Sequence, residues 1–344
     1  MRKLKTLILG LGRISYLLEK DTYRTHPCTH SGVLYSKFGK QRFELTGIYD
    51  TQTEKIKDFS KYWKIQSRKI ISDLKEIQNS MFDLCIIASS SISHYENAIF
   101  AIQKNIQHIL IEKPVCLNLD ELKKIYSLSK KKNINIWVNH ERRHHPVYSK
   151  VRKLYLENQL GKIKTIKASV LTNSNNDPTS SYIGHLLHDG THAVDYIHWL
   201  IGSPQKIESK YWVRSKKSNY AERIIAMFQY LNGEIVFLEV GGGRKYFQFE
   251  IDIETTSNRI VLSNDGHRFY EIGKSTLYKN FYSLFPAKNP VKSHSNPWII
   301  LYDEIYKKAT GKIETITGSL KDNLEIMEIL ETIRKNGKRQ IINF

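Results

Sequence analysis

Along the first 140 residues, short apolar runs alternate with longer segments whose apolar residues recur at helical spacing. The runs are continuous and rich in Ile, Leu and Val, which is typical of parallel strands buried on both faces. The helical segments between them supply the crossovers that parallel neighbours need. The pattern therefore predicts a doubly wound α/β domain with strands at residues 5–10, 43–50, 82–90, 107–113 and 134–140.

After residue 140 the pattern changes to strand-like runs joined by hairpin-like turns. Turn signals such as LNGE at 231–234 and SNDG at 263–266 separate several of these runs. We therefore expect two domains, residues 1–140 and residues 141–344, the second an α+β domain with a mostly antiparallel sheet. Helical periodicity in the second half remains at 146–160, at about 184–200, near 297–310 and at 319–336.

The net charge of the chain does not alter the predicted fold, but it bears on the expected partners. The chain of 344 residues carries 53 Lys and Arg against 34 Asp and Glu, a formal net charge of +19. The lysines are scattered, without an arginine-rich arm or basic residues interleaved with aromatics, so we expect no nucleic-acid partner. The charge would instead help to attract anionic small molecules.

Cysteine usage and hydropathy indicate the compartment. Three cysteines are an odd number without metal-site spacing, which argues against a disulfide framework. The N-terminal apolar run is interrupted by Arg13 and lacks a signal-peptide cleavage site. No uncharged run approaches the roughly 20 residues needed to span a bilayer. We expect a cytoplasmic protein without a membrane partner.

A glycine pattern follows the first predicted strand. The segment GLGRIS at 10–15 reads G-x-G-x-x-S and lies where a strand meets the next helix. Glycines there permit a tight turn and let a pyrophosphate approach backbone amides. A lone G-x-G is a weak signal, but its position after the first strand makes it a candidate dinucleotide loop.

The second predicted strand ends in Asp50, which is placed to accept hydrogen bonds from the adenosine ribose hydroxyls of NAD. No arginine follows it directly to hold the 2′-phosphate of NADP. Asp50 lies 40 residues beyond Gly10, whereas a compact motif needs about 20. The excess is an insertion around residues 19–32.

Three residues of this insertion, His26, Cys28 and His30, are of metal-binding type. No fourth ligand is nearby in the sequence, so we favour a structured loop and expect no metal.

Two further strand ends carry candidate chemistry. The strand predicted at 82–90 runs into ASSSISH (88–94), whose hydroxyl residues can line a nicotinamide ribose, cap a helix, or do both. The segment IEKPV (111–115) places Lys113 at the carboxyl edge of a parallel sheet, where such sheets bind ligands.

These motifs together resemble the glucose–fructose oxidoreductase / inositol dehydrogenase / MocA family. The resemblance implies an NAD(P)-binding Rossmann domain at 1–140, and a substrate-binding and oligomerisation domain at 141–344 built on a large open sheet. It also implies hydride transfer between NAD(P) and a carbohydrate-like hydroxyl or ketone. The matching segments are GLGRIS, Asp50, ASSSISH, IEKP, VNHERRHHP (138–146), GTHAVD (190–195) and GSLKDNLEIMEILETIRKNGKRQ (318–340).

The resemblance also assigns roles. Lys113 lies beside the substrate hydroxyl, and His192 reaches the same oxygen. Removing a proton as hydride leaves suits a group with a pKa of about 6.5, such as His. The charge of Lys113 can stabilise an alkoxide, or the residue can serve as a proton relay. Asp195, on the same helical face as His192, is expected to orient a neighbour or to cap local backbone rather than to react. NAD, in preference to NADP, is expected to contact Gly10, Gly12, Arg13, Ile14, Asp50, Ser89, Ser90, His94, Glu112 and Lys113.

One departure from the family affects the mechanism. The family commonly has an aspartate four residues before the histidine, and this chain has His188 there, with Asp189 next. We expect His188 to assist substrate binding or proton transfer. Two rival interpretations are a zinc site, with His185 and His198 nearby, and a purely structural polar helix. The zinc site lacks an H-E-x-x-H motif or a cysteine pair.

The substrate pocket has further candidates. Arg142 and Arg143 either contact a substrate phosphate or the rim of the crevice, or pair with carboxylates at the domain junction, and the sequence favours neither interpretation. Tyr182 and His185 are further candidates for the substrate pocket, on the basis of their position in the sequence alone.

We therefore expect an NAD-dependent oxidoreductase acting on a sugar or sugar derivative, possibly nucleotide-linked, that forms homodimers or homotetramers through an apolar sheet face. The alternative is a non-catalytic NAD(P)-binding sensor or regulator of the same fold.

Overall fold

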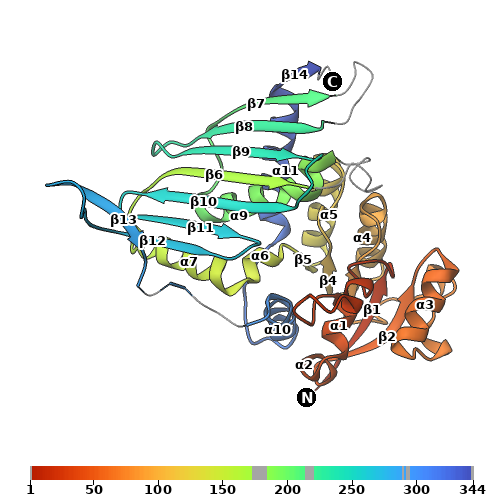
Figure 1. The fold of residues 1–344 in the computed structure, drawn as a ribbon. Helices are drawn as coiled ribbons and strands as arrows, with labels where there is room; N and C mark the ends of the chain where they lie inside the picture. The colour runs from red at the N-terminus through yellow and green to blue at the C-terminus, as the bar shows by residue number, and fades with distance from the viewer. Residues whose placement is uncertain (1, 173–183, 214–220, 289, 292–294, 342–344) are drawn as a thin grey trace. The chain divides into compact units, whose positions relative to one another are not determined.

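The computed structural model describes residues 2–172, 184–213, 221–288, 290–291 and 295–341 (Figure 1). Contacts divide the chain into two compact units. Unit 1 comprises Met1–Pro146 and His294–Leu324, and unit 2 comprises Val147–Ser293 and Glu325–Phe344. The chain thus leaves unit 1 at residue 146, close to the expected boundary at residue 140. It returns to unit 1 at residues 294–324, so two continuous domains do not describe this division. Among the described residues, no helix is long and apolar enough to cross a membrane.

Unit 1 is built on a parallel sheet in the order β2-β1-β3-β4-β5. An isolated parallel bridge between Ile48 and Ile70 adds an outer position beside β2, so the full order is that of a dinucleotide-binding fold. All five predicted strands are confirmed, and their central residues are fully buried. The strands are β1 (Leu4–Leu9), β2 (Phe43–Tyr49), β3 (Leu84–Ile87), β4 (His108–Ile111) and β5 (Asn135–Val138).

The helices of unit 1 begin where the sequence supplies caps. Asn118 accepts a hydrogen bond from the amide of Glu121 at the start of α5, and Asn296 caps α10 ahead of Pro297. The helices are α1 (His30–Tyr35), α2 (Lys37–Lys40), α3 (Thr53–Trp63), α4 (His94–Gln103), α5 (Leu119–Lys131), α6 (Glu141–His144) and α10 (Pro297–Ala309). Short 3-10 turns are η1 (Leu17–Lys20), η2 (Ser67–Lys69), η3 (Leu74–Glu76) and η4 (Ser91–Ser93).

Helix α10 explains why the chain returns to unit 1. Its residues Trp298, Leu301 and Tyr302 are buried in the same apolar cluster as Leu4, Phe43 and other strand residues. The helix thus covers apolar surface of the parallel sheet that the first 146 residues leave open.

Unit 2 contains, in its described part, a nine-stranded sheet in the order β13-β12-β11-β10-β6-β9-β8-β7-β14. All pairs are antiparallel except β6–β9 and β7–β14, so the mostly antiparallel sheet is confirmed. The strands are β6 (Ile163–Leu171), β7 (Lys206–Val213), β8 (Arg223–Gln229), β9 (Ile235–Gly241), β10 (Gln248–Thr255), β11 (Asn258–Ser263), β12 (Arg268–Lys274), β13 (Tyr282–Pro286) and β14 (Gly337–Ile341).

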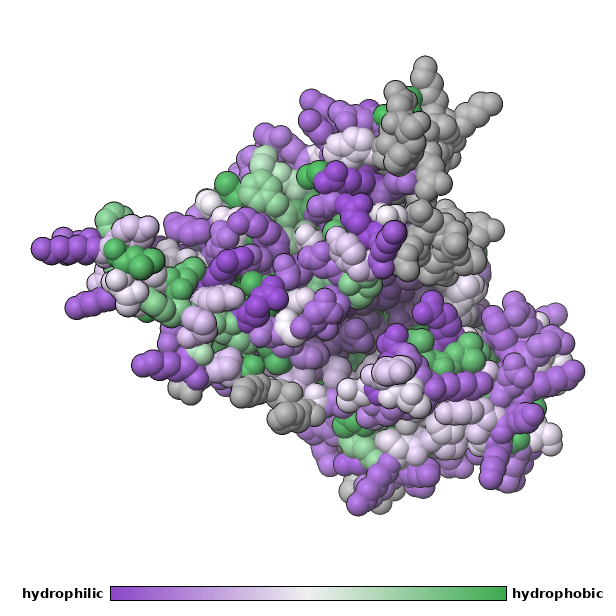
Figure 2. Space-filling view, viewed as in Figure 1, coloured by the Kyte–Doolittle hydropathy of each residue, from purple (hydrophilic) through white to green (hydrophobic). Residues whose placement is uncertain are grey.

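One face of this sheet is covered by helices α7 (Pro146–Leu156), α9 (Thr191–Ile201) and α11 (Leu320–Asn336). Their apolar residues share a core with Val236, Leu238 and Val240 of β9. The intervening side chains of β9 project to the other face, where Phe237 is 44% exposed. Figure 2 shows hydrophobic residues gathered over β12 and β13.

Candidate functional site

The loop after β1 can be formed only with glycine at its first position. Gly10 has a φ of +93°, and a Cβ there would lie 2.3 Å from the Cα of Ser89. A Cβ on Gly12 would meet nothing within 4 Å. Gly10 therefore permits the close approach of the β1 and β3 ends, whereas the space beside Gly12 is open to a ligand.

The backbone after Gly12 differs from the expected strand-to-helix transition. Residues 13–16 form a turn, followed by η1 rather than by a regular α-helix. The first turn is closed by a hydrogen bond from the Tyr16 amide to the Gly12 carbonyl. Among the described residues, the amides of Gly12, Arg13 and Ile14 have no acceptor, so they are available to an anionic group.

The carboxylate of Asp50 holds this loop in place. Its Oδ2 accepts a hydrogen bond from the Leu11 amide at 2.8 Å, and its Oδ1 accepts one from the Gln52 amide at 2.9 Å. A carboxylate has about four acceptor positions, so two remain for the hydroxyls of a ribose. The residues present therefore fit a dinucleotide whose pyrophosphate lies at Gly12 and whose adenosine ribose lies at Asp50.

The serine segment after β3 is a hydrogen-bonded cap. The Oγ of Ser89 accepts from Ser93 Oγ at 3.0 Å and from Asn97 Nδ2 at 2.9 Å. Ser90 is exposed. His94 is buried, with Nδ1 2.7 Å from the Pro114 carbonyl and Nε2 3.0 Å from the Ser89 carbonyl. His94 thus joins the ends of β3 and β4, and its burial lowers its pKa despite both carbonyls.

Lys113 is the second residue after β4 and is partly exposed, while Glu112, which directly follows the strand, is buried. The Oε1 of Glu112 lies 3.0 Å from His30 Nε2 and also accepts from Asn139 Nδ2. Burial acts to raise the pKa of Glu112, but the hydrogen bonds and the charge of His30 outweigh it and hold that pKa below its usual value. On the other side of His30, Nδ1 lies 2.8 Å from the Tyr302 hydroxyl.

This buried network of Tyr302, His30, Glu112 and Asn139 was not expected from the sequence. Its members are up to 272 residues apart, so no local spacing reveals it. The placement of Glu112 directly before Lys113 makes the network a support for the lysine.

The two arginines after β5 make different contacts. Arg143 is buried and its Nη1 lies 2.6 Å from Asp322 Oδ2, so it pairs with a carboxylate, which is the second of the two expectations for this residue. Arg142 Nη1 lies 3.6 Å from Glu141 Oε1. Nearby His144 is buried, and its burial and the charge of Arg143 lower its pKa to about 3.

The histidines of unit 2 lie where a helix changes its winding. Residues Leu186–Gly190 form a π turn (η5), and α9 begins at Thr191, whereas the sequence predicts one α-helix. Such π turns are frequent at functional sites. A Cβ on Gly190 would lie 3.0 Å from a Val240 methyl group, so glycine lets this turn approach β9.

Asp189 directly contacts a candidate site residue. Its Oδ1 lies 2.9 Å from His188 Nδ1. The pairing orients the His188 imidazole and directs Nε2 away from Asp189. The adjacency of the two residues in the sequence is the signal for this pair, although Asp189 is not among the expected site residues.

The other candidate residues on and next to this helix differ in exposure and in contacts. His192 is partly exposed, and Asp195 is fully buried. His185 is buried, with Nδ1 3.4 Å from Thr172 Oγ1, and His198 Nε2 lies 2.8 Å from Glu325 Oε2. Tyr182 lies outside the described residues.

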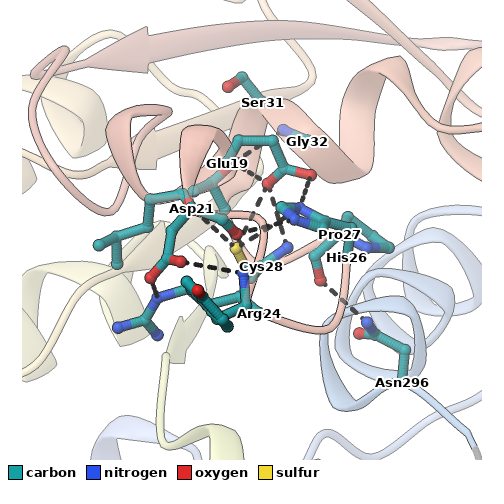
Figure 3. A network of polar contacts seen from close by, with 12 residues as sticks. Glu19, Asp21, Arg24, His26, Pro27, Cys28, Ser31, Gly32 and Asn296 are labelled. Carbon is teal, nitrogen blue, oxygen red and sulfur yellow. Dashed lines mark hydrogen bonds and ion pairs between the residues drawn. The ribbon is translucent and has the colours of Figure 1, made fainter.

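The insertion in unit 1 forms a polar cluster between η1 and α1 (Figure 3). Glu19, His26 and Cys28 place possible metal-ligand atoms within 4.8 Å of one another. His30 is not part of this cluster, because its imidazole contacts Glu112 instead. Burial raises the pKa of Cys28 to about 12, so the free thiol is protonated at neutral pH.

The fold and the glycine loop define a dinucleotide-binding protein of the oxidoreductase class. A family model described as "Oxidoreductase family, NAD-binding Rossmann fold" matches residues 4–140, and the "GFO/IDH/MocA C-terminal domain" matches residues 148–261. The chain belongs to the GFO/IDH/MocA family.

Curated relatives match parts of the chain. Glucose-6-phosphate 3-dehydrogenase of Bacillus subtilis is 26% identical over 186 residues, 50% of each chain. An uncharacterized oxidoreductase of Synechocystis is 30% identical over 35% of each chain. The alignments with these two relatives thus span about a third to a half of their length. The scyllo-inositol 2-dehydrogenase (NADP(+)) of Bacillus subtilis is 22% identical over 80% of this chain and 72% of its own.

Solved structures share the fold over nearly the whole chain. UDP-N-acetylglucosamine 3-dehydrogenase from Acidithiobacillus ferrooxidans has a TM-score of 0.74 at 15% identity, covering 98% of this chain and 99% of its own. The WlbA dehydrogenase from Bordetella pertussis, solved with NADH and UDP-GlcNAcA, has a TM-score of 0.76 at 17% identity, covering 97% and 96%.

Proposed function

We propose that the protein is an NAD-dependent oxidoreductase that moves a hydride between nicotinamide and a hydroxyl or ketone of a sugar or sugar derivative. The choice of NAD rests on Asp50, which directly follows β2. Its carboxylate accepts a hydrogen bond from the Leu11 amide of the glycine loop. A carboxylate there binds ribose hydroxyls and repels a 2′-phosphate. The residues that follow, Thr51, Gln52 and Thr53, bring no cation to offset this repulsion.

The bound cofactor would supply hydride acceptance or donation, and the protein would supply proton transfer and charge. We assign the proton transfer to His192, because a neutral imidazole accepts a proton near neutral pH. Lys113 stabilises the substrate oxygen as negative charge develops on it. The Lys113 backbone is fixed by Glu112, which is itself held by His30 and Asn139.

His188 is the proposed assistant in substrate binding or proton transfer. Oδ1 of Asp189 lies 2.9 Å from His188 Nδ1, so the carboxylate can form an ion pair with the imidazole when the ring is protonated. Arg142 remains a candidate for an anionic part of the substrate.

The substrate class rests on relatives and charge. The names of two relatives refer to glucose 6-phosphate and scyllo-inositol, and two fold neighbours to UDP-linked sugars. The net charge of +19 favours an anionic substrate. We therefore place phosphorylated and nucleotide-linked sugars ahead of free cyclitols.

We also propose self-association through the uncovered face of the nine-stranded sheet, giving a homodimer or homotetramer. Phe237 is 44% exposed and Ile235 38% on that face, and Tyr282 at its β13 edge is 65% exposed. Exposed apolar side chains on a sheet face are candidates for an interface. A single replacement, Phe237→Glu, is expected to shift the sedimentation coefficient to that of a monomer.

The decisive experiment titrates the purified protein with NADH and NADPH and follows nicotinamide fluorescence. Binding that prefers NADH supports the Asp50 assignment, while a preference for NADPH contradicts it. Binding of neither cofactor would contradict the oxidoreductase proposal.

A substrate screen then begins with sugar phosphates and nucleotide sugars. In the Lys113→Ala variant, turnover is expected to fall at least about 100-fold while NADH still binds. A protein that binds NADH but turns over nothing in this screen would instead be a sensor.

A further inference from the structure

The insertion in unit 1 brings together three side chains of different chemistry (Figure 3). His26 Nδ1 lies 3.0 Å from Glu19 Oε1, Cys28 Sγ lies 3.7 Å from Glu19 Oε2, and Sγ lies 3.9 Å from Nδ1. Thiol, imidazole and carboxylate form this cluster outside the dinucleotide loop. We propose that Glu19, His26 and Cys28 bind one zinc ion.

The separations fit a tetrahedral ion. Zinc lies about 2.3 Å from sulfur and about 2.0–2.2 Å from nitrogen or oxygen, so neighbouring donors of a tetrahedron are about 3.3–3.6 Å apart. The three observed separations differ from this range by only a few tenths of an ångström, although the two that involve Glu19 use different oxygens of its carboxylate. Glu19 must therefore rotate to present one oxygen to the ion, and one donor atom from each of the three residues already lies within 4.8 Å of the others.

The orientation of His26 favours the same conclusion. Its Nε2 lies 3.0 Å from the Asp21 carbonyl, which can only accept a hydrogen bond. Zinc ligands typically fix their tautomer in this way, with the second ring nitrogen donating to a carbonyl. Nδ1 then faces the Glu19 carboxylate at 3.0 Å. Two acceptors at this distance need either a proton or a cation between them.

Glu19 is held in position by its surroundings. Its Oε2 accepts from Thr29 Oγ1 at 2.7 Å and from the Cys28 amide at 3.1 Å. A Cβ on Gly32 would lie 2.2 Å from this oxygen, so only glycine leaves room for the carboxylate. The side chain of Glu19 is 11% exposed and that of His26 is 38% exposed. Water can therefore reach the cluster and complete four-coordination.

The donor set selects the ion. A thiolate and an imidazole favour zinc over Mg²⁺ or Ca²⁺, which prefer oxygen ligands. Binding replaces the proton of Cys28, which the thiol donates to the Leu18 carbonyl at 3.3 Å in the metal-free protein, and that proton is released to solvent. The bound ion would then restrict the motion of the loop that leads to Thr29 and His30 at the start of α1.

The experiment uses the whole protein, stripped with a chelator and titrated with Co²⁺ as a spectroscopic substitute for zinc. We expect one equivalent to give a thiolate-to-cobalt charge-transfer band and the intense visible absorption of a tetrahedral ion. Zinc should displace the cobalt, remain bound at one equivalent after gel filtration, and raise the Tm.

Three variants assign the site. Cys28→Ser should abolish the charge-transfer band, and His26→Gln, which keeps the thiol, should weaken binding at least about tenfold. Cys116→Ser is the matched control, because its sulfur contacts the Asn118 carbonyl outside the cluster, and it should leave the band unchanged. If the wild-type protein gives no thiolate band, or if Cys28→Ser retains it, the proposal is wrong and a proton joins Glu19 to His26.

Discussion

Nε2 of His30 lies 3.0 Å from Oε1 of Glu112, and both side chains are buried. His30 comes from the insertion after the glycine loop, whereas Glu112 directly precedes Lys113. The insertion therefore contributes to the support of the proposed catalytic lysine. A loop that lengthens the dinucleotide motif has thus become part of the core.

Removing His30 should destabilise the protein. His30→Ala leaves the buried carboxylate of Glu112 without one of its two donors, and an unsatisfied buried carboxylate costs about 3 kcal/mol or more. Tyr302→Phe removes only the hydrogen bond between the Tyr302 hydroxyl and His30, at a cost of about 1 kcal/mol. Urea unfolding measures both. Equal losses in the two variants would contradict a special role of His30 in satisfying Glu112.

Acid should destabilise the protein through His144. The pKa of this buried side chain is lowered to about 3 from 6.5, so between these values the unfolded chain binds a proton that the folded protein does not. Stability should therefore fall as pH drops below about 6.5, by up to about 1.4 kcal/mol per pH unit from this group. The Nε2 of His144 has no hydrogen-bond partner among the described residues. In His144→Leu, the slope of unfolding free energy against pH should be correspondingly smaller.

Asp50 should decide cofactor choice. Asp50→Ser removes charge-assisted hydrogen bonds to the ribose hydroxyls, so NADH affinity should fall at least about tenfold, equivalent to about 1.4 kcal/mol. NADPH affinity should fall less or rise, because the repulsion of the 2′-phosphate is lost. Fluorescence titration measures both, and a parallel loss for the two cofactors would show that Asp50 acts only through the Leu11 amide.

The two loop glycines should respond differently to alanine. Gly10→Ala places a methyl group 2.3 Å from backbone atoms of Ser89 at a positive φ, so we expect a loss of several kcal/mol in unfolding free energy. Gly12→Ala meets no atom within 4 Å and should leave stability nearly unchanged. Cofactor affinity should nevertheless fall in Gly12→Ala, because the methyl group occupies the ligand's space. Thermal melts and NADH titration separate the two effects.

The His188–Asp189 pair should affect turnover more than substrate affinity. Asp189→Asn removes the negative charge 2.9 Å from His188 Nδ1, so kcat should fall about 10-fold or more with little change in KM. His188→Ala should lower turnover at least as much. Unchanged turnover in His188→Ala would remove this residue from the mechanism, leaving His192 and Lys113.

The sequence predicts the parallel sheet well because buried strands leave continuous apolar runs, such as LKTLIL in β1. It does not reveal β12 and β13, whose mostly exposed side chains give no clear alternation, or β14, whose segment GKRQI is largely polar. The π turn is also missed, because it depends on packing against Val240 rather than on propensity.

For the candidate site, the sequence identifies the residues at strand ends. Gly10, Asp50 and Lys113 stand at the carboxyl ends of β1, β2 and β4 as expected. Contacts between distant segments could not be predicted from spacing, as with His30 and Glu112 or Glu19 and Cys28. Those contacts depend on how the insertion folds.

The return of α10 to unit 1 has a consequence for synthesis on the ribosome. Domains generally fold in order as they emerge, but Trp298 and Tyr302 complete the core around the first strands. The N-terminal unit cannot finish folding until almost all of unit 2 has been translated. We therefore expect the apolar core of the N-terminal unit to stay incomplete while residues 147–296 are translated.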